Sequence, residues 1–175
     1  CADEPDHPLN ISQRDIFLKC TSWIRCLKPG VRFSLANSSG IFLGGCWHFD
    51  LVRPGAALYG IAPQINIINP MKAVVRLTLP IVQVRTLSES ASVGYGAEVV
   101  LPAGTRIAVV AGGYADGLNR TLGKNPEGIL CGYSVNSIGR MSMDVTIFDI
   151  TNVPFPDEQL LESTVEVINQ DLPLD

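Results

Sequence analysis

The stretch Ala62-Pro63-Gln64-Ile65-Asn66-Ile67-Ile68-Asn69-Pro70 divides the sequence into two halves with different patterns. Its two prolines bracket a short segment, and proline breaks both helices and central strands. Before this stretch, helix-like and strand-like segments alternate. After it, short strands and turns follow one another. We therefore predict two domains, residues 1–62 and residues 63–175, joined near this linker.

The first half predicts a parallel α/β unit. Apolar residues recur at helical spacing after a capping-box pattern at Asn10, and Pro29-Gly30 ends this helix. The apolar face comprises Ile16, Phe17, Cys20, Trp23, Ile24 and Leu27. Strands are expected over Val31–Leu35 and Phe49–Val52, with a short helix between them. Two such units are too few for a closed barrel or a complete doubly wound sheet.

The second half predicts an all-β domain, either a barrel or a sandwich. Apolar residues alternate up to Leu79, and the apolar phase shifts after Pro80 to Val82 and Val84, which indicates a bulge or an edge position. Further strands are expected over Arg106–Ala111, Ile129–Gly132, Met143–Ile150 and Val165–Ile168. Turn residues separate them at 88–90, 102–104 and 125–128.

Composition excludes several classes of protein. The chain of 175 residues has a net charge of -4, so it lacks the basic patch of a nucleic-acid-binding domain. The sequence contains no apolar run long enough for a membrane span. Its five cysteines match no metal motif, and we expect free, mostly buried thiols in a reducing cytoplasm. Because the sequence begins at Cys1, without an initiator Met or signal peptide, we expect a piece of a longer protein.

Two loops of the first half are candidates for anion binding. If this half ends a barrel, Asn37-Ser38 and Gly55-Ala56 follow its last strands, where such barrels often bind phosphate. Ser38 offers a hydroxyl, and Gly55 and Ala56 offer N–H groups. The alternative is that Asn37-Ser38 only caps a helix, and the local sequence alone favours it.

Arg53 ends a buried-looking strand and needs an acceptor, because an unpaired buried arginine is unfavourable. A salt bridge to Asp50 and a contact with a ligand are equally consistent with the sequence.

Tyrosines set between glycines are candidates in the second half. Tyr95 lies in Val93-Gly94-Tyr95-Gly96, and Tyr114 lies in Gly113-Tyr114-Ala115-Asp116-Gly117. Flanking glycines leave room for a ligand to approach the phenol. The alternatives are a core position for Tyr95 and a purely structural turn at Tyr114.

A third segment, Gly139-Arg140-Met141-Ser142-Met143-Asp144, contains charged and apolar residues side by side. Arg140 and Asp144 could pair across a strand, and Met141 and Met143 would ordinarily belong to the core.

Together these segments resemble alanine racemase in order and spacing, and the resemblance covers nearly the whole chain. It rests on residues 93–96, 113–117 and 139–144, together with Ala36-Asn37-Ser38 and the run Phe49-Asp50-Leu51-Val52-Arg53-Pro54-Gly55-Ala56-Ala57-Leu58-Tyr59-Gly60. The resemblance implies the last part of a (β/α)₈ barrel that binds pyridoxal 5′-phosphate (PLP), joined to a C-terminal β domain that is truncated at its end. It also implies a homodimer that interconverts L- and D-alanine for peptidoglycan.

The resemblance assigns roles to individual residues. Ser38, Gly55 and Ala56 would hold the PLP phosphate, and Arg53 would face the pyridine nitrogen. Tyr95 would be the base that acts on the substrate of the partner subunit. The substrate pocket would contain Tyr114 and Met143, and the substrate access channel would contain Arg140 and Asp144. No residue would bind a metal.

The family's lysine for PLP has no counterpart here. The chain has only Lys19, Lys28, Lys72 and Lys124, and none lies in the family's lysine motif. The resemblance therefore implies that a missing N-terminal barrel segment supplies this lysine and that the chain alone is inactive. A related PLP-dependent amino-acid racemase or decarboxylase, and a non-catalytic β-domain dimerisation module, remain alternatives.

Overall fold

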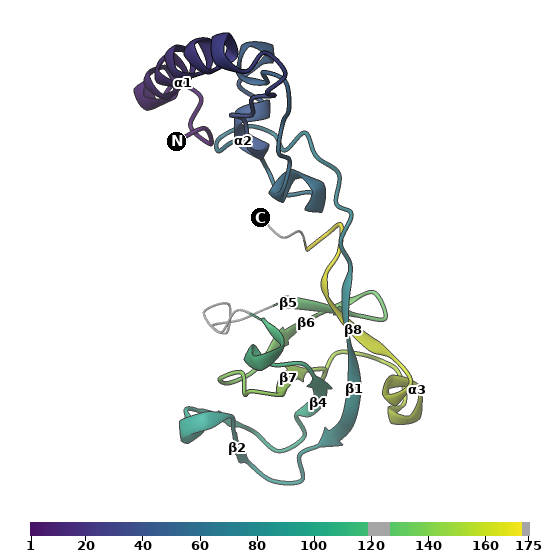
Figure 1. The fold of residues 1–175 in the computed structure, drawn as a ribbon. Helices are drawn as coiled ribbons and strands as arrows, with labels where there is room; N and C mark the ends of the chain where they lie inside the picture. The colour runs from purple at the N-terminus through teal and green to yellow at the C-terminus, as the bar shows by residue number, and fades with distance from the viewer. Residues whose placement is uncertain (119–126, 173–175) are drawn as a thin grey trace. The chain divides into compact units, whose positions relative to one another are not determined.

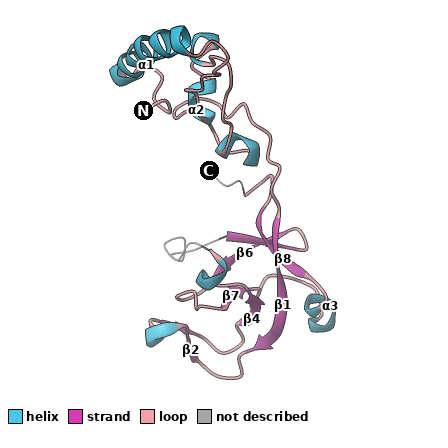
Figure 2. Cartoon of the chain, viewed as in Figure 1, coloured by secondary structure: helices cyan, strands magenta, loops and turns pink. Residues whose placement is uncertain are grey.

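The computed structural model describes residues 1–118 and 127–172 (Figure 1). These residues fall into two compact units, Cys1–Val75 and Arg76–Leu172. Helices make up most of the regular structure in the first unit, and strands dominate the second (Figure 2). The predicted order, an α/β part followed by an all-β domain, is confirmed.

The longest helix of the first unit, α1, spans Pro8–Leu27. Pro8 suits the first helical position because its fixed φ matches the helix and its missing N–H is not needed there. The preceding His7 caps the helix, with its Nδ1 accepting from the N–H of Leu9 at 3.2 Å. The capping box predicted at Asn10 is therefore wrong. The buried side-chain amide of Asn10 instead donates to backbone carbonyls, including that of Glu4 at 2.9 Å.

The predicted apolar face of α1 is only partly covered within its own unit. Phe17 packs edge-on against Phe33 and Phe49, with ring centroids 6.4 and 4.8 Å away. Trp23 and Leu27 have exposed fractions of 68% and 63%. The helical period was predicted correctly, whereas most of the expected burial is not found.

The two strands expected in the first unit are extended segments with little pairing. The Asp50 N–H donates to the Phe33 carbonyl at 3.0 Å, and the Arg53 N–H donates to the Ala36 carbonyl at 2.9 Å. Only one parallel bridge, between Asn37 and Arg53, is formed. An isolated pair of strands is at most marginally stable, which accounts for this limited pairing. The prediction of strands at Val31–Leu35 and Phe49–Val52 is therefore wrong.

Short helices follow these segments. They are α2 (Ser38–Ile41), η1 (Gly45–Trp47) and η2 (Ala56–Tyr59). Asn37 caps α2, because its Oδ1 accepts from the Gly40 N–H at 2.9 Å. The predicted helix after Asn37 is thus confirmed.

The second unit is a closed antiparallel barrel with the strand order β1-β4-β7-β6-β5-β8. Its strands are β1 (Leu77–Thr86), β4 (Arg106–Ala111), β5 (Glu127–Leu130), β6 (Tyr133–Ser137), β7 (Val145–Asp149) and β8 (Thr164–Ile168). A separate two-stranded sheet joins β2 (Ala91–Val93) to β3 (Val99–Leu101). The remaining elements are η3 (Tyr95–Ala97), η4 (Tyr114–Asp116) and α3 (Asp157–Leu161). The observed architecture decides between the two predicted alternatives in favour of the barrel.

Most barrel strands lie close to their predicted positions. The predicted strand at Ile129–Gly132 is wrong in its second half, because Cys131 and Gly132 form the turn between β5 and β6. Their φ values of 51° and 84° are left-handed, as expected in a two-residue hairpin turn. Of the turn predicted at 125–128, residues 125 and 126 lie outside the described residues, and 127–128 begin β5.

The bulge predicted at Pro80 is present in β1, but it lies after that residue. The register with β4 shifts between Ile81 and Gln83. Ile81 is buried, whereas Val82 is 55% exposed. The predicted inward position of Val82 is therefore wrong, and the apolar phase resumes at the half-buried Val84.

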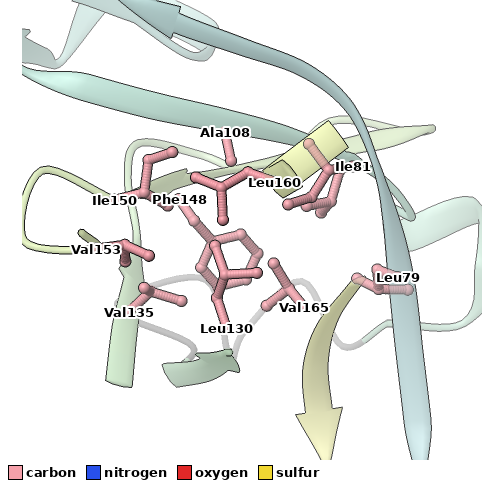
Figure 3. Packing of buried hydrophobic residues seen from close by; sticks show 11 residues of the cluster. Leu79, Ile81, Ala108, Leu130, Val135, Phe148, Ile150, Val153, Leu160 and Val165 are labelled. Atoms are coloured by element: carbon pink, nitrogen blue, oxygen red, sulfur yellow. The ribbon is translucent and has the colours of Figure 1, made fainter. Parts of the chain in front are cut away.

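The barrel core surrounds Phe148, which is fully buried together with Leu130 and Val165 (Figure 3). Leu160 reaches the same cluster from α3. Arg106, at the start of β4, ties this helix region to the barrel. Its guanidinium donates to the carbonyls of Val153 and Phe155 at 3.0 and 2.7 Å, and it also pairs with Asp157. None of the helices found in the described parts of the chain combines the length and the hydropathy that a membrane crossing needs.

Candidate functional site

The Ser38 hydroxyl accepts hydrogen bonds from backbone N–H groups of the first unit. It accepts from the N–H of Gly55 at 2.8 Å and from that of Ala57 at 3.2 Å. The serine is only 6% exposed. Because Asn37 provides the cap of α2, the Ser38 hydroxyl is available to the Gly55 loop. The two residues thus have different tasks, although their neighbouring positions suggested a single one.

The Gly55 loop has open space beside these donors. A Cβ built on Gly55 meets no atom within 4 Å. Ala56 begins η2, and the first N–H groups of a helix have no carbonyl acceptor inside it. The Ser38 hydroxyl, which accepts from the N–H groups of Gly55 and Ala57, and the start of η2 therefore lie next to open space at Gly55.

Arg53 makes its contacts with the extended segment that precedes α2. Its guanidinium donates to the carbonyl of Ser34 at 3.0 Å, to the Ser34 hydroxyl at 2.6 Å and to the carbonyl of Leu35 at 3.2 Å. The salt bridge to Asp50 that the sequence allowed is wrong. Asp50 instead pairs with Arg25 at 2.9 Å and accepts from the Phe33 N–H. Ser34 was not singled out from the sequence, because a lone serine in an apolar run carries no pattern.

Arg53 also lines a cavity of about 230 Å³ within the first unit. Asn37 and the buried amide of Asn10 belong to the same wall. Arg53 thus holds the Ser34 segment through its guanidinium and also borders an open volume, which suits a residue that contacts both protein and ligand.

Tyr95 is exposed in the second unit, with an exposed fraction of 53%. It begins η3, which connects β2 to β3. Positive φ values of 79°, 77° and 51° occur at Gly94, Gly96 and Ala97. These left-handed conformations turn the backbone sharply and present the phenol on the outside of the hairpin. The alternative that Tyr95 belongs to the core is wrong.

The segment 139–144 contacts both tyrosine segments through the backbone. A Cβ at Gly94 would lie 2.9 Å from the Arg140 nitrogen, and one at Gly139 would lie 2.9 Å from the Val93 oxygen. On the other side, the Ala115 N–H donates to the Met143 carbonyl at 3.0 Å. Half-buried Tyr114 donates its N–H to the Ser142 carbonyl at 3.1 Å. The three segments that the sequence singled out therefore meet in space.

The side chains of this third segment have unexpected partners. The Arg140 guanidinium forms a bidentate ion pair with Glu98, with Nε donating to Oε2 at 3.0 Å. The predicted pairing of Arg140 with Asp144 is therefore wrong. The Asp144 carbonyl accepts from the Gly112 N–H at 2.9 Å. Met143 is 48% exposed, which contradicts a core position, whereas Met141 is buried as expected.

The lysines that the structure describes belong to none of these segments. Lys19 lies in α1, Lys28 caps its end, and Lys72 lies ahead of β1 rather than starting a strand; Lys124 lies outside the described residues. Within residues 1–118 and 127–172, no group of three or more His, Cys, Asp or Glu residues is arranged to hold a metal ion. All five cysteines are free and exposed, so the prediction of mostly buried thiols is wrong.

An α/β unit with a serine–amide cluster, followed by a closed β barrel with an exposed tyrosine, defines a two-domain α/β–β-barrel protein. Residues 1–63 match the family model described as "Alanine racemase, N-terminal domain", and residues 74–174 match "Alanine racemase, C-terminal domain". The chain belongs to the alanine racemase family, as its motifs indicated.

Individual relatives agree with this assignment. The alanine racemase of Rhodospirillum rubrum is 49% identical over 177 residues, which cover 100% of this chain and 46% of that protein. A crystal structure of alanine racemase from Bartonella henselae with covalently bound pyridoxal phosphate has a TM-score of 0.80 at 33% identity and covers 99% of this chain and 46% of its own. The biosynthetic alanine racemase from Pseudomonas aeruginosa gives 0.77 at 31%, covering 100% of this chain and 48% of its own. The chain thus spans about half the length of the relatives that it matches.

Proposed function

We propose that this chain is part of an alanine racemase, an isomerase that interconverts L- and D-alanine for peptidoglycan synthesis and uses PLP. The observation that carries the proposal is the exposed phenol of Tyr95 on a glycine-flanked turn that is packed against Arg140. The 49% identity to an alanine racemase along the whole chain supports it.

Racemisation requires a proton to leave one face of the α-carbon and another to arrive on the opposite face. Two bases on opposite sides accomplish this, because neither has to move across the substrate. Tyr95 supplies one of them, acting on the substrate bound to the partner subunit of a homodimer. Its open surroundings in the hairpin suit a phenol that must reach a substrate outside its own barrel.

PLP, when bound, stabilises the negative charge that develops at the α-carbon. Ser38 and the N–H groups of Gly55 and Ala56 would hold its phosphate. The donor set fits, because a hydroxyl and backbone N–H groups are the partners that phosphate accepts from, and space is open beside Gly55. The serine hydroxyl can donate to phosphate as well as accept from the loop.

Arg53 would contact the pyridine nitrogen of the cofactor. A guanidinium is a donor without acceptor capacity, so it would donate to the ring nitrogen and disfavour protonation there. The contacts with Ser34 and Leu35 hold the guanidinium in place. This arrangement favours return of the proton to the α-carbon over transamination.

The remaining residues shape the path of the substrate. Tyr114 and Met143 line the substrate pocket, and the Met143 backbone N–H is available to the alanine carboxylate. Arg140 and Asp144 lie along the access channel. The five free thiols are consistent with a reducing cytoplasm as the place of action.

The test compares Tyr95→Phe with Tyr133→Phe in the complete protein that contains this chain. Tyr133 is a matched control, because it is an exposed phenol of the same unit, 42% accessible, on β6. Conversion of L- to D-alanine is followed together with exchange of the α-proton in D₂O. We expect Tyr95→Phe to lower interconversion at least about 100-fold while exchange persists for one enantiomer, since one base remains.

Tyr133→Phe should change interconversion less than about twofold. Full activity of Tyr95→Phe, or equal loss of exchange for both enantiomers in a folded variant, would refute the assignment of Tyr95 as one of two bases.

A further inference from the structure

We propose that Glu98 is a positioning residue for Tyr95, acting through its ion pair with Arg140. This inference rests on the proposed function, because it explains how the phenol is kept in place for catalysis. Glu98 lies at the end of the turn, three positions after Tyr95, and would act on the phenol through Arg140 rather than on the substrate.

The turn around Tyr95 has little internal support. The flanking strands β2 and β3 contain three residues each and, among the strands of the described residues, pair only with one another. Within the turn, the Ala97 N–H reaches the Gly94 carbonyl at 3.4 Å, which is a long hydrogen bond. A two-stranded hairpin of this size is marginal by itself, so an external anchor is needed to fix the phenol.

Arg140 supplies that anchor on both sides of Tyr95. Its backbone nitrogen lies close to Gly94, the residue before Tyr95. A Cβ built on Gly94 would lie 2.9 Å from this nitrogen. Its guanidinium holds the Glu98 carboxylate after the tyrosine through two N–O contacts. One residue therefore clamps the turn at both ends, and the clamp closes only if Glu98 carries a carboxylate.

The geometry of the pair favours positioning over stabilisation. Arg140 and Glu98 have side-chain exposures of 54% and 51%, and exposed ion pairs contribute little to overall stability. A bidentate arrangement nevertheless fixes orientation, because the planar guanidinium meets both carboxylate oxygens. Loss of Glu98 should therefore loosen the turn and leave the barrel intact.

The first test measures amide hydrogen exchange of residues 94–101 in the complete protein without substrate. We expect Glu98→Gln to accelerate exchange there about two- to fivefold, with the melting temperature unchanged within about 2 °C. Arg76→Gln is the matched control, because Arg76 forms an exposed pair with Glu166 between β1 and β8 of the same unit. The control should leave exchange in residues 94–101 unchanged.

A charge swap tests the pairing itself. Glu98→Arg combined with Arg140→Glu should restore slow exchange, whereas each single substitution should not. Unchanged exchange in Glu98→Gln, or failure of the swap to restore it in a folded protein, would overturn the inference.

Kinetics then connect the clamp to catalysis. Glu98→Gln should lower kcat about tenfold with KM changed less than about twofold, because a misplaced base slows the chemical step more than it weakens binding. If exchange accelerates and kcat is unchanged, the clamp exists but does not position a catalytic group, and the inference fails. If Tyr95→Phe keeps full activity, the proposed function fails, whatever the exchange data show.

Discussion

Gly113 and Met143 approach so closely that a Cβ built on Gly113 would lie 2.3 Å from the Met143 carbonyl oxygen. The Ser142 oxygen lies 2.4 Å from the same position, so the contact involves rigid backbone on both sides. Lack of space, rather than backbone conformation, requires a glycine at this position. Its φ of -146° is accessible to any residue. This contact sets the separation of Tyr114 from Met143.

Gly113→Ala should destabilise the barrel by about 3 kcal/mol, because backbone must shift to admit the methyl group. The thermal midpoint of the complete protein would fall, and turnover would fall further as Tyr114 and Met143 move apart. Gly45→Ala serves as the control, since a Cβ there meets no atom within 4 Å. Equal midpoints for the two variants would contradict the spatial argument.

Ser38→Ala should leave the N–H groups of Gly55 and Ala57 without their acceptor. Unsatisfied buried donors are unfavourable by about 1–3 kcal/mol, so amide exchange in residues 55–59 should accelerate even without PLP. The affinity of the complete protein for PLP should drop at least about tenfold. Ser39→Ala, a change at the neighbouring hydroxyl, should affect neither measurement. Normal PLP affinity in Ser38→Ala would remove this serine from the phosphate site.

The Glu166 carboxylate gives the barrel a dependence on pH. Hydrogen bonds from Arg76 and then Asn169, at 2.6 and 2.9 Å, lower its pKa below the ordinary 4.5. A lowered folded-state pKa means that the stabilisation is present above the ordinary value and is lost as pH falls through the folded-state value. Glu166→Gln should thus weaken the protection of amides in β1 and β8 at about pH 6, and the difference from wild type should shrink towards about pH 3.5.

Comparing the two proteins at each pH cancels the intrinsic pH dependence of exchange. Glu89→Gln, at an exposed carboxylate of the same unit, is the control for a general effect of charge. A difference between Glu166→Gln and wild type that grows on acidification would have the opposite sign to this prediction.

The sequence predicted the barrel better than the first unit, and pairing explains why. β4 was predicted with its observed bounds, since its apolar run is bounded by turn residues and both of its edges pair with strands of the same unit. The segment Val31–Leu35 has an equally strand-like sequence. The one β-bridge near it, between Asn37 and Arg53, lies beyond its end. Strand formation depends on whether a neighbouring strand is available for pairing, and a local sequence pattern does not contain that information.

The candidate site could be predicted from the sequence where a glycine marks a close approach between two backbone segments. Gly94 and Gly113 drew attention to Tyr95 and Tyr114, and the contacts at both glycines explain why no larger residue fits. Glu98 carried no such signal, because an acidic residue in a turn is ordinary and its partner lies 42 positions away. β2, β3, β6 and α3 were also missed, each being too short to display a period.

The closed barrel and the β2–β3 hairpin differ in how firmly strand pairing holds them. Every strand in the ring has two neighbours, so no strand can detach without breaking two ladders at once. The β2–β3 hairpin that carries Tyr95 lies outside this ring and shares none of its ladders. Substitutions in the hairpin can therefore change the surroundings of Tyr95 while the hydrogen-bonded ladders of the ring are retained.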